Sequence, residues 1–238
     1  MGKKNTSETK KITVLTGAGV SADSGISTFR DADGLWEGHD VMEVASPQGF
    51  ANNPSLVLDF YNQRRKRLKE VSPNPAHLAL AELEAYYEVS IITQNVDDLH
   101  ERAGSTHVVH LHGELLKMRS SGNEFVIWDC EGDIVVGDLC EQGHQLRPHI
   151  VWFGEAVPQL EKAASETRSA DILIIIGTSM QVYPAASLVH YANEGVPIYF
   201  IDPDPNVSEH DLDNLSIIPE TAAKGVPPLV SDLIAAAS

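Results

Sequence analysis

Cysteine is scarce in this sequence, and the scarcity argues against a protein held together by disulfides. The 238 residues include only Cys130 and Cys140, so a reducing, cytoplasmic setting is expected. No apolar run reaches the roughly 18–20 residues that a membrane-spanning helix needs. The opening residues, MGKKNTSETKK, contain no apolar secretion-signal core. We therefore expect a cytoplasmic protein that does not work in a membrane.

Positive charge is the second shortage. Seventeen Lys and Arg against 34 Asp and Glu give a formal net charge of −17. This balance argues against nucleic acid as the main partner, because phosphate backbones are bound through Lys and Arg. An acidic surface suits cationic partners such as lysine-bearing proteins, and it also keeps a protein soluble without any partner. The 42% of hydrophobic residues is typical of a folded globular protein.

Short apolar runs, each ending in small or polar residues, predict the strands of a parallel sheet. The runs are ITVLT, VSIIT, ILIII and PIYFI, at residues 12–16, 89–93, 172–176 and 197–201. Nearly continuous β-branched runs are typical of strands buried on both faces. Helix-like stretches occupy residues 75–87, 158–169, 184–193 and 228–237. The alternation predicts an α/β protein with a Rossmann-like doubly wound sheet, whose ligands lie beyond the carboxyl ends of the strands.

Two segments interrupt this alternation and predict a second, smaller inserted lobe. One contains a loop and a helix, and the other looks irregular, with scattered Gly, Ser and Asp and both cysteines. We expect the small lobe to comprise residues 32–72 and 114–148. The Rossmann-like domain would then comprise residues 1–31, 73–113 and 149–238.

A glycine turn follows the first predicted strand. Gly17, Ala18 and Gly19 would let backbone N–H groups approach a phosphate, although they also suit an ordinary tight turn. The longer run from Gly17 to Arg30, GAGVSADSGISTFR, resembles the signature of the sirtuins, a family of NAD-dependent protein lysine deacylases. Further motifs resemble the family in the same order, namely TQNVDDLHERAG, HLHG, LRPHIVWFGE and GTSMQVYPAA.

The resemblance implies which residues bind NAD. Those implied for the pyrophosphate and its ribose are Gly17, Ala18, Gly19 and Arg30. Phe29 would shield the nicotinamide. Asn95 and Asp97 would hold the carboxamide of the nicotinamide, and the resemblance also implies a catalytic role for Asn95. Gln94 would hold the adjoining ribose. Those implied for the adenosine half are Gly177, Thr178, Ser179, Asp202 and Ala222. Asp202 stands where the family often has asparagine, and the family pattern is blurred around Ala222.

The motif HLHG contains two histidines that could share one face of a strand. That spacing would suit a metal site, and a buried, hydrogen-bonded role is the commoner alternative for either histidine. In the sirtuins the histidine directly before the glycine is the general base, which implies this role for His112 and leaves His110 structural. The reaction implied transfers the acyl group of an acyl-lysine to NAD, with release of nicotinamide and 2′-O-acyl-ADP-ribose. Imidazole suits this proton transfer because its ordinary pKa is about 6.5.

The substrate implied is an acylated lysine within an extended peptide. The peptide would pair with Val151, Phe153 and Gly154 on one side and with Val182 on the other, although the run VWF also suits a core strand.

Two rival functions remain open at this point. A mono-ADP-ribosyltransferase could use the same scaffold, because its cofactor chemistry begins identically. A non-catalytic module could bind NAD or acyl-lysine, but the joint presence of His112, Asn95 and Asp97 argues against it.

The stretch DFYNQRRKRL, residues 59–68, places four consecutive basic residues in an acidic chain. At about 100° per residue on a helix, Arg64 lies among apolar residues, with Arg65 and Arg67 at the edges of that face. Lys66 and Asn62 point away from it. An arginine on an apolar face needs an anionic or hydrogen-bonding partner, and a neighbouring carboxylate would suffice.

A second possible partner follows from the sirtuin resemblance. Bacterial members of class III, the subclass that removes negatively charged acyl groups, carry a Tyr-x-x-Arg pair at this place. Tyr61 and Arg64 match the pair, and Ala45 matches the small residue that widens the acyl pocket. The resemblance thus implies removal of succinyl, malonyl or glutaryl groups as well as acetyl groups.

The cysteine pattern departs from the family. Most sirtuins hold a structural zinc ion with two short-spaced pairs of cysteines, and no such pair exists here. A makeshift set of Cys130, Cys140 and His144 stays open. We expect packing to hold the small lobe together without zinc.

Overall fold

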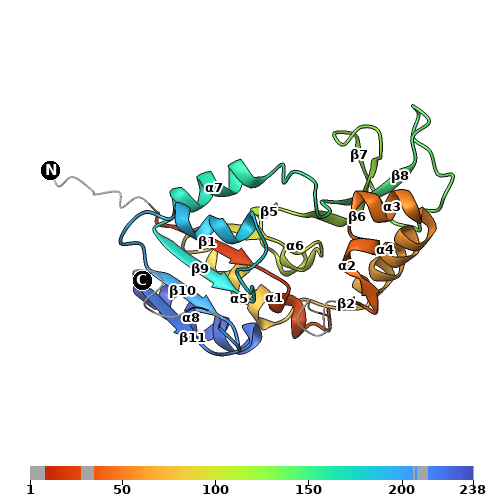
Figure 1. Ribbon diagram of the computed structural model, residues 1–238. Helices are drawn as coiled ribbons and strands as arrows, with labels where there is room; N and C mark the ends of the chain where they lie inside the picture. Colours follow the sequence, from red (N-terminus) through yellow and green to blue (C-terminus); the bar gives the residue numbers. More distant parts are fainter. Residues whose placement is uncertain (1–8, 28–34, 206, 208–213, 238) are drawn as a thin grey trace.

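The large lobe is built on a six-stranded parallel sheet (Figure 1). The computed structural model describes residues 9–27, 35–205, 207 and 214–237. The strand order is β11-β10-β9-β1-β4-β5. The strands are β1 (Lys11–Thr16), β4 (Glu88–Thr93), β5 (Val108–His110), β9 (Ile172–Ile176), β10 (Ile198–Ile201) and β11 (Leu215–Ile218).

The four strands predicted from apolar runs are confirmed, and they form the middle of this sheet. Strands β5 and β11 are the two edges, and they were not predicted. Each is short, and an edge strand is buried by neighbours on one side only, so its sequence carries a weaker apolar signal. The doubly wound α/β class is confirmed.

Helices cover both faces of the sheet because successive residues of a strand point to opposite sides. Ile12 and Val14 of β1 pack on one face, and Leu15 packs on the other. The first face is covered by α5 (Pro75–Leu83) and α8 (Ala222–Ala237), and the second by α7 (Leu160–Arg168) and the 3₁₀ helix η2 (Ala185–Tyr191). Helix α8 begins six residues before the predicted start at residue 228. Pro228 suggested a first helical position, but it lies inside the helix.

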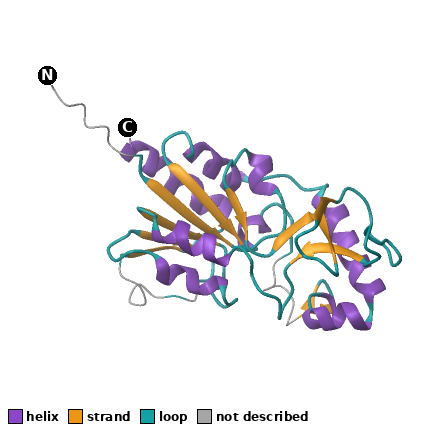
Figure 2. Ribbon diagram, turned by 90° about the horizontal axis from the view of Figure 1, so that it is seen from above, coloured by secondary structure: helices purple, strands orange, loops and turns teal. Residues whose placement is uncertain are grey.

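The small lobe combines helices with a second sheet (Figure 2). Its helices are α2 (Val41–Val44), α3 (Pro47–Asn52) and α4 (Pro54–Leu68), and a hairpin joins β2 (Leu35–Trp36) to β3 (His39–Asp40). The antiparallel sheet has the order β7-β6-β8, formed by β7 (Ile127–Asp129), β6 (Gly113–Ser120) and β8 (Leu146–Ile150).

The expectation that residues 114–148 are irregular was wrong, because they contain most of this antiparallel sheet. Strand β7 is exposed along its whole length, and β6 is only partly buried. Their sequences therefore lack the continuous apolar runs that reveal the central strands of the large sheet.

Helix α4 buries two faces, and this corrects the predictions for Arg65 and Asn62. Tyr61 and Phe60 pack in one cluster, as expected. Arg65, predicted at an edge, is only 2% exposed and donates to the carbonyls of Leu115 and Gly132. Asn62, predicted to point away, is buried and donates to the carbonyl of Ile134. The second face exists because a loop distant in sequence packs against the helix.

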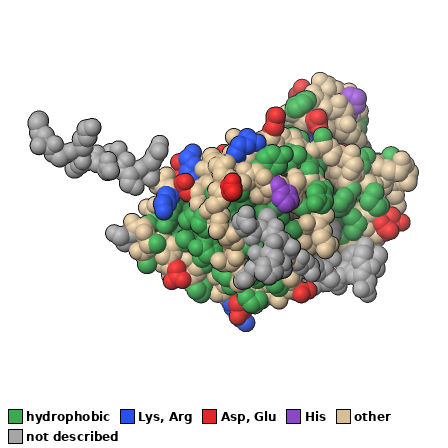
Figure 3. All heavy atoms as spheres, turned by 60° about the vertical axis from the view of Figure 1, so that its left-hand side comes forward, with side chains coloured by type: hydrophobic (Ala, Val, Ile, Leu, Met, Phe, Trp, Pro, Cys, Tyr) green, Lys and Arg blue, Asp and Glu red, His purple; other side chains and the backbone are tan. Residues whose placement is uncertain are grey.

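The surface carries scattered charges and some exposed apolar side chains. On the face shown in Figure 3, Lys and Arg side chains do not gather into one broad patch. The exposed apolar residues of the small lobe include Phe125, Trp128, Val135, Val136 and Leu139. Within the described ranges, no helix is both long enough and apolar enough to cross a membrane.

Candidate active site

The loops that carry the predicted site residues meet at the carboxyl ends of the parallel strands. These ends face the small lobe in Figures 1 and 2. The chain runs from β1 through β4 to β5 in one direction, and then returns to place β9 on the other side of β1. The strand order reverses between β1 and β9, and ligands of open α/β sheets bind at such a switch point.

The glycine turn after β1 packs directly against the turn after β9. Gly17 N–H donates to the carbonyl of Ile176 at 3.0 Å, and Gly19 N–H donates to that of Gly177 at 2.8 Å. A Cβ atom on Gly19 would lie 2.6 Å from the Cα of Gly177, too close for any side chain. Glycine is therefore required here by the contact between two loops.

The amide of Ala18 lies between the hydrogen-bonded amides of Gly17 and Gly19 and has no hydrogen-bond partner among the described residues. Within the turn it is the N–H group left to meet a phosphate. A close glycine-lined backbone with a free amide fits the pyrophosphate of a dinucleotide.

The side chains of Asn95 and Asp97 are joined by Ser21. The Ser21 hydroxyl donates to Asp97 Oδ2 at 3.0 Å and accepts from Asn95 Nδ2 at 3.1 Å. All three side chains are buried, and burial raises the pKa of Asp97. An amide and a carboxylate fixed together can both accept from and donate to a carboxamide. Sequence reasoning gave Ser21 no role, although it lies inside the quoted glycine motif.

The other predicted cofactor residues that the structure describes lie along the same edge. The side chain of Gln94 donates to Thr178 Oγ1 at 3.1 Å, which ties the turn after β4 to the turn after β9. Asp202 follows β10 and is buried, and Ala222 begins α8. Gly177 and Ser179 flank Thr178 in the β9 turn. Phe29 and Arg30 lie outside the described residues.

His112 has the hydrogen bonding that a general base needs. Its Nδ1 donates to the backbone carbonyl of Gln94 at 3.0 Å, so the other nitrogen, Nε2, carries the free lone pair. Burial lowers the pKa of His112, and the Gln94 carbonyl opposes this shift in part. The imidazole is consequently neutral and able to accept a proton at pH 7.

His110 lies in a different environment. Its Nδ1 faces the carbonyl of Asn95 at 3.1 Å, and its Nε2 faces Glu101 at 2.7 Å. Burial alone would lower the pKa of His110, but the hydrogen bond and charge of Glu101 outweigh it and raise the pKa. Two acceptors favour a doubly protonated ring, which holds the Asn95 loop and offers no lone pair. Within the described ranges no group of three His, Cys, Asp or Glu is arranged to hold a metal.

Part of the backbone of the predicted peptide-binding segment is already hydrogen-bonded to other parts of the protein. Val151 N–H donates to the carbonyl of His112, and Phe153 N–H donates to that of Ala45, each at 2.9 Å. Gly154 has φ of +91°, which turns the chain away after Phe153. The amide and the carbonyl of Trp152 both bond to Glu155. The groups left for a peptide in this described segment are the carbonyls of Val151 and Phe153 and the amide of Gly154. Val182 is half-buried, and its carbonyl accepts from Ala186.

Tyr61 and Arg64, the residues predicted to bind the acyl group, lie three positions apart on α4. Tyr61 is fully buried, in the cluster that also contains Ala45. The side chain of Arg64 is 11% exposed, and its guanidinium carbon lies 4.1 Å from the ring centroid of Trp36. Its Nη1 lies 3.3 Å from Glu37 Oε1, so the carboxylate partner foreseen as one alternative is present. Its Nε is buried and has no partner among the described residues.

Comparison with known proteins identifies the family. The model of the Sir2 family matches residues 17–184. The chain belongs to the Sir2 family. The NAD-dependent protein deacylase of Helicobacter pylori (strain ATCC 700392 / 26695) is 58% identical over 229 residues, which cover 96% of this chain and 100% of that protein. The NAD-dependent protein deacylase of Bacteroides thetaiotaomicron is 52% identical, over 95% of this chain and 99% of that protein.

Solved structures of the Sir2 family show the same fold. A Sir2 homologue in complex with NAD matches with a TM-score of 0.85 and 42% identity, over 97% of this chain and 92% of that one. A Sir2 structure described as containing a p53 peptide and NAD⁺ matches with a TM-score of 0.76 and 28% identity, over 94% of each chain.

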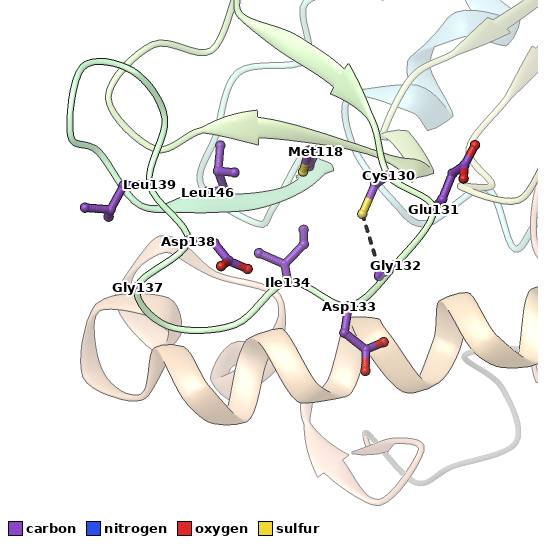
Figure 4. A pocket seen from close by; sticks show the side chains of 10 residues that line it. All are labelled: Met118, Cys130, Glu131, Gly132, Asp133, Ile134, Gly137, Asp138, Leu139 and Leu146. Carbon is purple, nitrogen blue, oxygen red and sulfur yellow. Dashed lines mark hydrogen bonds between the residues drawn. The ribbon is translucent and has the colours of Figure 1, made fainter.

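The cysteines of this Sir2-family chain lie apart from the candidate active site. Cys130 is buried and donates to the carbonyl of Gly132, while Cys140 is half-buried beside the hydroxyl of Ser120. Cys130 lines a cavity of about 390 Å³ that lies against α4 in the small lobe (Figure 4). The side chain of His144 is exposed.

Proposed function

We propose that this Sir2-family protein, an NAD-dependent protein deacylase, acts preferentially on lysine side chains whose acyl group carries a carboxylate. The observation that supports this preference is the guanidinium of Arg64. It is almost buried, it lies beside Tyr61, and it retains hydrogen-bonding capacity that the described residues do not fill.

The contact with Glu37 leaves room for a second carboxylate. Glu37 Oε1 lies 3.3 Å from Arg64 and 3.7 Å from Arg67, so one oxygen serves two guanidinium groups. A guanidinium has five N–H donors in a planar fork. Arg64 can thus hold Glu37 and still donate to a succinyl, malonyl or glutaryl carboxylate. Tyr61 supplies a hydroxyl close by, because residues three apart on a helix are neighbours.

The chemistry needs few groups from this chain. NAD, when bound, supplies the ribose carbon that receives the acyl oxygen. His112 accepts a proton at Nε2, with its ring held by the Gln94 carbonyl. Ser21, Asn95 and Asp97 would hold the nicotinamide carboxamide. The turns after β9 and β10 would hold the adenosine half, and the Ala18 amide would meet the pyrophosphate.

The substrate we propose is an acyl-lysine within an extended protein segment. The p53 peptide named for a related structure supports a peptide substrate. The segment would lie between Val151, Phe153 and Gly154 on one side and Val182 on the other. The rival reading as a mono-ADP-ribosyltransferase is tested by product analysis: 2′-O-acyl-ADP-ribose indicates a deacylase, and ADP-ribosylated protein indicates a transferase.

We further propose that the small lobe needs no zinc and that the protein is cytoplasmic. Cys130 packs with Leu58 and Ile134 in a small apolar cluster, where a thiol acts as an apolar group. Both cysteines are free, which fits a reducing compartment. Elemental analysis should find no stoichiometric zinc. One zinc ion per chain, retained against a mild chelator, would contradict the proposal.

The acyl preference is tested with Arg64→Met on succinyl-lysine and acetyl-lysine peptides. Because a charge-assisted hydrogen bond contributes about 1.5–3 kcal/mol, kcat/KM for the succinyl peptide should fall roughly ten- to a hundredfold. The value of kcat/KM for the acetyl peptide should not change. Arg67→Met is the matched control, since Arg67 touches the same carboxylate but is half exposed. Equal losses on both peptides would mean that Arg64 is structural.

A further inference from the structure

Trp152 and Tyr61 form a buried hydrogen bond whose direction is fixed by chemistry. The indole Nε1 of Trp152 lies 3.0 Å from the hydroxyl oxygen of Tyr61, and the two residues are 2% and 0% exposed. An indole nitrogen can only donate. The Tyr61 oxygen must therefore accept in this bond, and the proton of its hydroxyl must point elsewhere.

The Tyr61 hydroxyl is available as a donor. Burial raises the pKa of Tyr61, so the hydroxyl keeps its proton at every pH at which the protein works. Among the described residues no acceptor bonds to this proton. Arg64, three residues further along α4, is the nearest cation along that helix face, and the charge of Arg64 acts on the Tyr61 hydroxyl. An acceptor bound at Arg64 is thus the group this proton would meet.

The Trp152 ring is itself held in place. The guanidinium carbon of Arg147 lies 3.2 Å from its ring centroid, and Phe50 lies at 5.2 Å. Arg147 is fixed by Glu155 at 2.6 Å and by the carbonyl of Ile150 at 2.9 Å. A cation over an indole ring is attracted to its π face, so Arg147 restrains the plane of the ring.

Glu155 also fixes the backbone beneath the ring. One of its carboxylate oxygens accepts from the amide of Trp152 at 2.8 Å, while the other accepts from Arg147. The same residue thus anchors the main chain of Trp152 and the cation that stacks on its side chain. The direction of the indole N–H is therefore determined before any ligand arrives.

We propose that Trp152 is a positioning residue for acyl selectivity. By donating to Tyr61, it makes the Tyr61 hydroxyl present its proton to the carboxylate of an acyl group held by Arg64. This inference rests on the proposed preference for acidic acyl groups and deepens it. A buried indole N–H usually has a partner for stability alone, and a purely structural bond would affect all acyl groups equally.

The test uses Trp152→Phe, which keeps an aromatic ring and removes the N–H group. Steady-state kinetics are measured on succinyl-lysine and acetyl-lysine peptides with saturating NAD. KM for the succinyl peptide should rise about three- to tenfold, the size of one hydrogen bond, with kcat unchanged. Kinetics on the acetyl peptide should change less than about twofold. Trp128→Phe, in the exposed strand β7, is the matched control and should alter neither.

A double-mutant cycle with Tyr61→Phe tests whether Trp152 acts through Tyr61. If Trp152 acts through Tyr61, adding Trp152→Phe to Tyr61→Phe should cost nothing further on the succinyl peptide. Independent, multiplicative losses would overturn the proposal, and so would equal losses on the succinyl and acetyl peptides.

Two further measurements separate this inference from the proposed function. If Arg64→Met reduces desuccinylation and Trp152→Phe does not, the inference falls and the proposed function stands. If Arg64→Met has no selective effect, both fall. The NMR signal of the Trp152 indole proton can be assigned by its loss in Trp152→Phe. In the free enzyme, the chemical shift of this signal should change in Tyr61→Phe. An unmoved signal would mean that the bond itself is absent in solution.

Discussion

Arg64 and Glu37 form an ion pair between α4 and the β2–β3 hairpin, with 3.3 Å between the guanidinium Nη1 and the carboxylate Oε1. Glu37 has φ of +52°, a left-handed conformation that is uncommon for residues other than glycine, in the turn between β2 and β3. The hairpin thus holds a carboxylate beside the arginine proposed to bind the carboxylate of the substrate. Arg64 can donate to both carboxylates, but the negative charge of Glu37 would oppose the binding of a second anion.

Glu37→Gln should therefore improve binding of acidic acyl groups. Removing the opposing charge is expected to lower KM for the succinyl peptide by about two- to fivefold, the range of a partly exposed ion pair. The acetyl peptide should be unaffected. Glu43→Gln, an equal change of charge at an exposed position of α2, is the control. A higher succinyl KM in Glu37→Gln would indicate that Glu37 positions Arg64 and does not oppose binding.

His112→Ala should reduce deacylation by about 10²–10⁴-fold, the usual contribution of a general base. Binding of NAD and the melting temperature should change little, because only a proton-transfer group is lost. His144→Ala removes an exposed histidine and serves as the control. Turnover close to that of the wild type would remove His112 from this role.

The pH dependence of kcat/KM follows from the same histidine. The neutral imidazole is the active form, and burial lowers the pKa of His112 below its ordinary value. Activity should therefore be lost as the pH falls through a value below about 6.5, and it should be level through neutral pH. An acid limb centred above about pH 6.5 would contradict this assignment.

Asp97→Asn should weaken inhibition by free nicotinamide. The carboxylate that accepts from Ser21 and faces the proposed carboxamide site would become an amide, and the hydrogen-bond pattern would no longer match. The measurement is the nicotinamide inhibition constant at fixed NAD and peptide. Asp98→Asn, next in sequence and paired with Arg102, is the control. An inhibition constant that is the same in Asp97→Asn and wild type would contradict the site.

His77 should make the fold sensitive to acid. It is fully buried, and burial lowers its pKa to about 4. In the unfolded chain it takes up a proton near pH 6.5, so stability is full above about 6.5 and declines as the pH falls to about 4. The shift corresponds to about 3 kcal/mol of unfolding free energy.

His77→Gln should flatten this decline, because glutamine does not titrate and can still accept from the amide of Asn74 at the start of α5. The check is the melting temperature of both proteins between about pH 7 and pH 4.5. Parallel curves would show that His77 does not control acid stability.

The sequence by itself determined the central strands, the order of the motifs and the family to which they belong. Runs of β-branched residues such as ILIII suit a doubly buried strand whatever surrounds them. Motifs at the carboxyl ends of such strands must gather at one edge of the sheet, because parallel strands all end on the same side. The residues around Gly17, Asn95 and Gly177 could therefore be grouped from the succession of strands and motifs alone.

Tertiary structure alone decided the partners of these residues. Helical periodicity singled out Arg64 as the buried basic residue, yet Arg65 is buried more deeply, because the loop at Gly132 packs on a second face of α4. The contacts of Arg64 with Glu37 and of Tyr61 with Trp152 join residues 27 and 91 positions apart. A local pattern records which face of an element is apolar, but hydrogen-bond partners are set by the packing of segments distant in sequence.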